Sequence, residues 1–382
     1  MPPRRRNVKN TPASSEGAGL LETSLETSKY SLSGKLSLAF VVAIALVLAF
    51  GTFHFQRNGL GGISKDIPDP VAKRDATIFR VEDMPGKGKG VIAVRDIEQG
   101  ELIIYEHPLF VVPTQISVSP VDLIFSNLQR LDTSAREAFF NLSYVNLPSG
   151  VDPQVNTGEV ALAIFQTNAV AAGNGGVGIF PRMARLNHGC SGAFNVVYTW
   201  RENEGAIVVH ALKRIKKGQE LLTTYTNTKQ PRDRRRAYLA SQYGFNCQCD
   251  VCSLPEVESQ MSDRRLNAMT DLYAQFSMWG AKEISGIHAI DIAKKIWNVG
   301  GEEGYLSERG QLAADAVWVA AAHSDAEAAQ EWARLAVRWY SYEVGSDSEQ
   351  VEDLKRYITN PRSHRAWGTR ESLRVGTPGE LL

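Results

Sequence analysis

The four cysteines of this chain constrain its fold more than any other feature. Three of them, Cys247, Cys249 and Cys252, form a C-x-C-x-x-C cluster, and the fourth, Cys190, lies far upstream. Four thiolates, three of them packed into one short loop, are the ligand set of a tetrahedral structural zinc site. Such a site would tie two distant segments together and fix the position of whatever lies beside them.

Two other interpretations of these cysteines remain open. An even number of cysteines in a secreted chain can indicate disulfide bridges. Residues only two or three positions apart make strained bridges, however, and small secreted scaffolds are far richer in cysteine. Zinc is therefore the favoured interpretation, with free thiols second and disulfides third.

Composition allows a large core but does not indicate a nucleic-acid partner. The chain has 382 residues, of which 43% are hydrophobic, enough for two domains and a tail. Basic and acidic residues balance at 42 each, and the cysteine cluster supplies no helix that could read a groove. We therefore expect no direct nucleic-acid binding. The dense basic cluster from Arg232 to Arg236 is interpreted as the solvated face of a helix that begins near Pro231.

The N-terminal part contains an apolar segment without charge. Leu36 to Gln56 is long enough to predict a membrane-spanning helix, preceded by a disordered tail at 1–35 and followed by a linker at 57–76. We expect a membrane-anchored protein with its folded part in the cytoplasm, because thiolate sites last best in a reducing compartment. The basic residues before the span favour the opposite orientation. If the segment is no anchor, the nucleus or cytoplasm is the alternative location.

The remaining chain alternates between strand-like and helical patterns. Short strand patterns separated by turn residues run from Ile78 to Val112 and return between Phe194 and Tyr225. Apolar residues at helical spacing dominate the later part. There, Ser324 and Gly345 are expected to begin and end one helix. The predicted organisation is a strand-rich domain at 77–230 with a helical insert at about 113–180, a zinc-binding segment at 231–253, and an α-helical, TPR-like region at 254–382.

Four segments in a fixed order resemble the SET-domain protein lysine methyltransferases. They are Gly88-Lys89-Gly90, Asn187-His188-Gly189-Cys190, the strand that ends at Tyr225, and the closing C-x-C-x-x-C cluster, known in that family as post-SET. The resemblance covers about residues 78–252 and is nearest to fungal-type and SMYD-like members, without the MYND zinc finger of the latter. It implies an α+β, mostly-β SET fold, with small twisted sheets around a threaded C-terminal segment, a helical insert, and an α-helical C-terminal region.

The resemblance also implies a reaction and its site. S-adenosylmethionine would donate a methyl group to the ε-amine of a lysine in a histone or non-histone protein. Tyr225 is the expected catalytic residue, which would align the amine with the methyl carbon. Zinc would do no chemistry and would hold an aromatic lid over the donor. The expected donor-binding residues are Gly88, Lys89, Gly90, Asn187, His188, Tyr243 and Phe245.

The segment after Cys190 departs from the family pattern. Gly189, Gly192 and Ala193 stand where serine and a Pro-Asn pair are usual, and Asn195 comes two residues late. This change loosens the expected turn. It leaves open a second hypothesis, an inactive SET-like scaffold whose helical C-terminal region binds partners.

Overall fold

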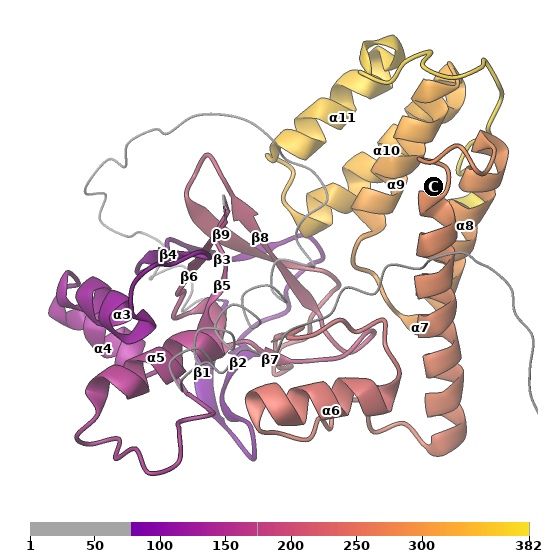
Figure 1. Ribbon diagram of the computed structural model, residues 1–382. Coiled ribbons are helices and arrows are strands. Elements are labelled where there is room, and N and C mark those ends of the chain that lie inside the picture. Colours follow the sequence, from indigo (N-terminus) through magenta and orange to yellow (C-terminus); the bar gives the residue numbers. More distant parts are fainter. Residues whose placement is uncertain (1–77, 174, 382) are drawn as a thin grey trace, which may run out of the picture.

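The computed structural model describes residues 78–381 except residue 174, and the strand-rich and helical parts of this range lie side by side (Figure 1). The predicted tail at 1–35, the apolar segment Leu36–Gln56 and the linker at 57–76 fall outside the described residues. Small sheets, a helical insert and a helical C-terminal region make this the predicted α+β class.

The strand-rich part consists of small sheets whose strands come from distant parts of the chain. In the first, β1 (Phe79–Met84) pairs with β2 (Gly88–Ala93), and in the second β7 (Asn187–His188) runs parallel to β10 (Leu222–Thr223). The third has the antiparallel order β3 (Leu102–Glu106), β9 (Ala206–Ala211), β8 (Val196–Arg201). The fourth has the order β4 (Val111–Pro113), β6 (Gly176–Gly178), β5 (Val170–Ala171).

Strand β9 shows why this sequence builds a closed core. All six of its residues are buried, so its apolar run lacks the alternation of a strand with one solvated face. Ile207 and Val209 pack with Ile104 of β3 in the main core of the strand-rich part. His210 is the polar member of the strand, and it faces the helical region beside Gly345.

Three helices form the insert between β4 and β5. They are α3 (Pro120–Gln129), α4 (Thr133–Phe140) and α5 (Thr157–Asn168). The side chains of Ser119 and Asp132 cap the first two helices by accepting backbone N–H groups. Phe110 lies between Phe139 and Phe165, with ring centroids 5.9 Å from each, so aromatic packing gives the insert a core of its own.

The C-terminal region is a stack of helices behind the strand-rich part. It contains α6 (Arg232–Tyr243), α7 (Glu256–Ser277), α8 (Gly286–Glu303), α9 (Arg309–Ala322), α10 (Ala326–Glu343) and α11 (Glu349–Thr359). Short 3-10 turns lie at Met183–Arg185, Pro361–Ser363 and Gly379–Leu381. On α10, Trp332, Leu335 and Ala336 are fully buried, as their spacing along one helix face predicts.

The start of α10 differs by one residue from the prediction. Asp325 is the N-cap and accepts the N–H of Ala328 at 3.3 Å. Ser324 instead adopts a φ of +59° in the tight turn that follows α9. The carboxylate of Asp325 also accepts the N–H of Val375 at 2.8 Å, so the cap fixes the C-terminal segment as well as the helix.

Several contacts join the helical region to the strand-rich part, and two of them illustrate how the parts are held together. Arg201 at the end of β8 donates to Asp347 at 2.6 and 2.9 Å and to the backbone oxygen of Val344 at 2.9 Å. A second contact packs Phe194 edge-on against Tyr305, with ring centroids 5.8 Å apart. Together these contacts position the helices against the sheets.

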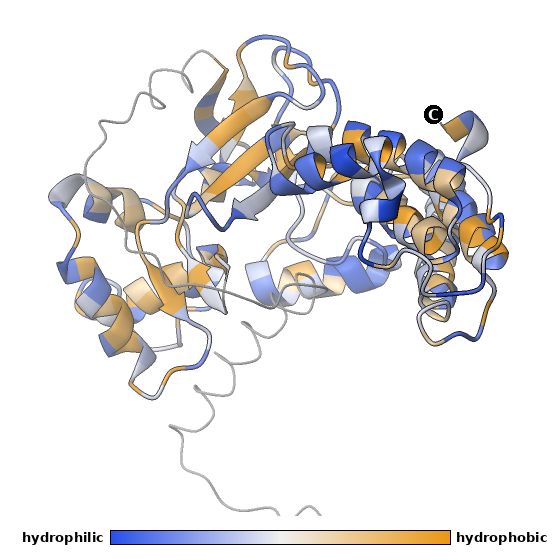
Figure 2. Cartoon of the chain, turned by 90° about the horizontal axis from the view of Figure 1, so that it is seen from above, coloured by the Kyte–Doolittle hydropathy of each residue, from blue (hydrophilic) through white to orange (hydrophobic). Residues whose placement is uncertain are grey.

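The predicted membrane anchor requires a correction. Within 78–381, leaving out residue 174, no helix combines the length and the hydropathy needed to cross a bilayer. Charged residues such as Arg264 and Arg265 interrupt even the 22-residue α7, and hydrophilic and hydrophobic residues mix along the helices of Figure 2. For the part of the chain that the structure describes, the expectation of a membrane-anchored protein is therefore wrong.

Candidate active site and cysteine cluster

The four cysteines meet in one buried cluster. Their sulfur atoms all lie within 4.8 Å of one another, and each cysteine is buried. No disulfide joins them, since the Sγ atoms of Cys190 and Cys252 are 3.5 Å apart and all four cysteines are free. Cys190 comes from the turn after β7, whereas the other three follow α6. The cluster therefore joins the two segments, and it could hold a metal ion.

Helix α6 places two arginines against this cluster. Arg235 is 1% exposed, and its guanidinium lies 4.0 Å from the Sγ of Cys252. Burial alone would lower the pKa of Arg235, yet the charges of Cys190 and Cys252 outweigh burial and raise that pKa. Arg236 donates to the backbone oxygens of Cys247 at 3.2 Å and Cys252 at 2.8 Å. A buried cation beside the sulfurs favours their thiolate form.

The interpretation of the arginine cluster as a solvated face is therefore only partly right. Arg234 is exposed, but Arg235 and Arg236 point inward and Arg232 is bonded to Glu256 at 2.6 Å. Sequence spacing offers only a partial signal for the burial of Arg235. Arg235 and Leu239 are four residues apart and lie on one helix face, and both are buried.

His188 connects the cysteine cluster to the segment after β10 that carries Tyr225. The backbone N–H of Tyr225 donates to Nδ1 of His188 at 3.0 Å, so the proton of the neutral ring is on Nε2. Nε2 faces the Sγ of Cys190 at 3.1 Å. Burial lowers the pKa of His188 to about 4, which keeps the ring neutral. Both ring nitrogens are thus engaged within the protein.

Aromatic rings gather beside this histidine. The ring centroid of Tyr225 lies 5.4 Å from that of His188 and 5.0 Å from that of Tyr243, and Phe245 lies 6.3 Å from His188. The hydroxyl of Tyr225 donates to the backbone oxygen of Leu186 at 2.6 Å. Burial, together with the neighbouring Tyr243, raises the pKa of Tyr225 well above its usual range. This tyrosine therefore keeps its proton at neutral pH.

The glycine turn of β2 lies against Asn187. A Cβ on Gly90 would come within 2.9 Å of the Asn187 amide nitrogen and within 2.9 Å of a carboxylate oxygen of Glu220, so only glycine fits here. Gly88 has a φ of +72°. The side chain of Lys89 is bonded to Asp83 at 2.9 Å on the β1–β2 hairpin.

The unusual residues after Cys190 have structural reasons. A Cβ on Gly189 would lie 2.8 Å from the backbone nitrogen of Phe194, and one on Gly192 would lie 2.6 Å from the backbone oxygen of Glu303. Asn195 holds β10 by accepting the N–H of Leu222 at 2.8 Å. It also donates to the backbone oxygen of Glu220 at 2.8 Å. The turn is therefore tight, and not loosened as the sequence predicts.

Glu303 at the end of α8 secures that turn. Its carboxylate accepts Ser191 Oγ at 2.8 Å, Ser262 Oγ at 2.6 Å and Arg265 Nε at 2.9 Å. Only 2% of its side chain is exposed. The helical region is thus bonded to the residue next to Cys190, a link that no local sequence pattern shows.

Comparison with known proteins identifies the segment that contains Asn187, Cys190 and Tyr225. The family model described as SET domain matches residues 88–226. The chain carries a SET domain. The resemblance stated from the motifs is confirmed, since the match includes the Gly88–Gly90 turn, Asn187, Cys190 and Tyr225.

Two curated relatives and one solved structure illustrate the similarity. The histone-lysine N-methyltransferase set5 of Schizosaccharomyces pombe is 28% identical over 76% of this chain and 86% of its own length. The N-lysine methyltransferase SMYD2 of Gallus gallus is 28% identical, over 37% of this chain and 34% of its own length. A structure described as the SET domain of LSMT bound to lysine and AdoHcy aligns over 85% of this chain and 91% of that chain, with 12% identity and a TM-score of 0.28.

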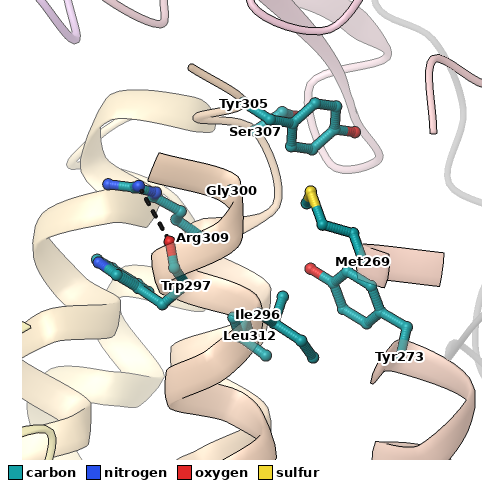
Figure 3. A pocket seen from close by; sticks show the side chains of 9 residues that line it. All are labelled: Met269, Tyr273, Ile296, Trp297, Gly300, Tyr305, Ser307, Arg309 and Leu312. Carbon is teal, nitrogen blue, oxygen red and sulfur yellow. Dashed lines mark hydrogen bonds between the residues drawn. The ribbon is translucent and has the colours of Figure 1, made fainter. Parts of the chain in front are cut away.

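A small cavity lies away from the SET site, between α7, α8 and α9. Its volume is about 10 Å³, room for about one water molecule. Figure 3 shows the hydroxyls of Tyr273 and Tyr305 on one side and Arg309 on Trp297 on the other. None of its lining residues belongs to the predicted donor or catalytic set.

Proposed function

We propose that this SET-domain protein is an S-adenosylmethionine-dependent protein lysine N-methyltransferase. The observation that carries the proposal is the convergence of Gly90, Asn187 and Tyr225 beside Cys190 within the matched residues. The name of the fission-yeast relative supports the same reaction class, because the alignment spans most of both chains. The acceptor would be a lysine of a protein, whether histone or not.

The residues present suit S-adenosylmethionine, which when bound supplies an electrophilic methyl group. Gly88 and Gly90 let the β2 backbone approach a ligand without a side chain in the way. The amide of Asn187 is half-buried beside them. Phe245 and Tyr243 offer aromatic surface next to His188. His188 has both ring nitrogens engaged, so we assign it to positioning the strand and leave donor contacts to its backbone.

Zinc is the metal that best suits the cluster. Four sulfur ligands at tetrahedral range leave no open position, which is typical of structural sites. Arg235 would offset the negative charge of four thiolates, and the N–H of Cys190 donates to the Sγ of Cys249 at 3.4 Å. Cys190, Cys247, Cys249 and Cys252 would hold the ion and thereby fix Tyr243 and Phe245 against the SET core.

Tyr225 would act by position and not as a base. Its raised pKa keeps the phenol protonated, and the hydroxyl is held by the backbone oxygen of Leu186. A fixed hydroxyl and carbonyl can orient an incoming amine along the line of displacement. The same groups can make weak C–H···O contacts to a methyl group. Water exclusion by the surrounding aromatic rings would favour the neutral, nucleophilic amine.

The test measures binding and transfer separately on the full, zinc-loaded chain. Calorimetry should detect S-adenosylmethionine binding that Asn187→Ala weakens strongly. Methyl transfer to histone and lysate proteins should fall by about a hundredfold in Tyr225→Phe, with affinity for the donor nearly unchanged. The matched control is Tyr144→Phe, because Tyr144 is exposed on the insert. It should behave as wild type.

The alternative of an inactive scaffold rested on the altered turn after Cys190. The glycines of this turn allow Phe194 and Glu303 to approach closely, and Asn195 is hydrogen-bonded to β10. The altered residues therefore give no argument for inactivity. A folded, metal-containing protein that binds no S-adenosylmethionine would restore the scaffold as the better account.

A further inference from the structure

The carboxylate of Glu220 is fixed beside the glycine turn. It is 11% exposed, with Oε1 accepting the Asn187 amide Nδ2 at 2.8 Å and Oε2 accepting Lys87 Nζ at 2.7 Å. Its backbone oxygen is held by Asn195 at 2.8 Å. With both oxygens and the backbone engaged, the carboxylate has one position relative to Asn187.

This arrangement determines which end of the Asn187 amide faces outward. An ionised carboxylate can only accept hydrogen bonds, so the NH₂ group of Asn187 must point at Glu220. Its Oδ1 then faces away, and no group in the described part of the chain donates to it. A ligand that meets Asn187 must therefore present a hydrogen-bond donor, and a nearby carboxylate favours a cationic one.

Gly90 makes the pair possible. The position that a Cβ would take lies 2.9 Å from Asn187 Nδ2 and 2.9 Å from Glu220 Oε1, with Met84 Cγ at 2.5 Å. These distances are below ordinary contact, so a side chain here would push the two partners apart. The glycine, the amide and the carboxylate thus form one unit.

We propose, on the basis of the proposed function, that Glu220 is a positioning residue of the donor site. It orients the Asn187 amide so that Oδ1 receives the α-ammonium group of S-adenosylmethionine. The adenine amine and the ribose hydroxyls are also hydrogen-bond donors, but they are uncharged. The carboxylate beside Asn187 selects the ammonium group among them.

The test compares two nucleosides on the full, zinc-loaded chain by calorimetry. S-adenosylhomocysteine retains the ammonium group, whereas 5′-methylthioadenosine keeps the adenine and ribose but lacks the amino-acid end. Glu220→Ala should lower the affinity for S-adenosylhomocysteine by about 10- to 100-fold, which is the effect of losing one hydrogen bond to a charged group. The same variant should change the affinity for 5′-methylthioadenosine by less than about twofold. Glu220→Gln keeps an acceptor oxygen, so its affinity for S-adenosylhomocysteine should lie between those of the wild type and Glu220→Ala.

A double-mutant cycle separates positioning from direct contact. Because Glu220 acts through Asn187, the Glu220→Ala/Asn187→Ala double variant should bind S-adenosylhomocysteine no more weakly than Asn187→Ala alone. The control Glu98→Gln changes an exposed carboxylate, 68% accessible and remote from the turn. It should leave both affinities unchanged.

The other possible results of the calorimetry each contradict the proposed function, this inference, or both. If the wild type binds neither nucleoside, the proposed function and this inference fail together. If the wild type binds S-adenosylhomocysteine and Glu220→Ala binds it equally well, or loses both ligands equally, only the inference fails. If Glu220→Ala does not fold, Gly90→Ala decides, because it separates the same pair: selective loss of S-adenosylhomocysteine supports the inference, and unchanged affinity refutes it.

Discussion

Replacing Glu303 with alanine tests whether the helical region holds the turn after Cys190 in place. The carboxylate joins Ser191, next to Cys190, to Ser262 and Arg265 on α7. Alanine would remove all three acceptor contacts at once. The turn after Cys190 would then lose its bonded connection to α7 and α8 at this point.

The size of the effect follows from the contacts. Breaking a buried ion pair costs about 3–5 kcal/mol, but Arg265 is 25% exposed and would be partly solvated after the change. The two serine hydroxyls contribute roughly 1–3 kcal/mol each when left unpaired. Because water can enter beside Arg265, we place the loss of unfolding free energy at about 3 kcal/mol. This loss corresponds to a shift of about 1 M in the urea midpoint.

The assay is urea unfolding followed by tryptophan fluorescence, with zinc release measured in parallel by a chromogenic chelator. Glu302→Ala is the matched control, because Glu302 is the adjacent residue of α8 and is exposed. It should change stability by less than about 0.5 kcal/mol. Coincident midpoints and zinc-release rates for the two variants would refute the idea that Glu303 holds the turn.

Three further predictions concern other parts of the molecule. Arg235→Met removes the buried cation beside Cys252, so zinc should be released to a chelator at least tenfold faster, with retention at the wild-type rate as the contrary result. His210 is buried and its pKa is lowered to about 4 by burial and then by the charge of Arg201. The unfolded chain binds this proton at higher pH, so stability should be complete above about pH 6.5 and fall by up to roughly 3 kcal/mol toward pH 4. His210→Gln should flatten that part of a urea-midpoint profile, and an unchanged profile would exclude His210 as its source. Gly192→Val should destabilise the protein by about 2 kcal/mol or more, because its Cβ would lie 2.6 Å from the Glu303 oxygen; equal melting temperatures would contradict this packing.

The sequence predicted those parts of the site that rest on short-range chemistry. The spacing of Cys247, Cys249 and Cys252 limits them to one loop, and the structure places Cys190 with them. The Gly88–Gly90 segment was likewise visible as a local pattern, whereas the strand expected to run to Tyr225 ends at Thr223. For the cysteines and the glycines, the residue types and their spacing alone carried the information.

The parts that were missed depend on contacts between distant segments. Glu220 lies in the apolar pattern that leads to Tyr225, but its pairing with Asn187 and Lys87 arises only once β2, β7 and β10 meet. Arg235 looked like one of several solvated arginines, since a charge pattern does not say which face a neighbouring loop will cover. Glu303 had no local signal at all.

The contact between Ser191 and Glu303 also has a consequence for the order in which the protein is made. The two residues are 112 positions apart, and a ribosome adding about 5–20 residues per second needs roughly 6–22 s to cover that distance. Once Cys252 has been added, the strands, the cysteine loop and α6 have all been synthesised, while the carboxylate that secures the turn lies 51 residues further along the chain. The nascent SET domain therefore passes through a period in which the turn after Cys190 lacks its partner Glu303, and a chain stalled before α8 would retain that incomplete form.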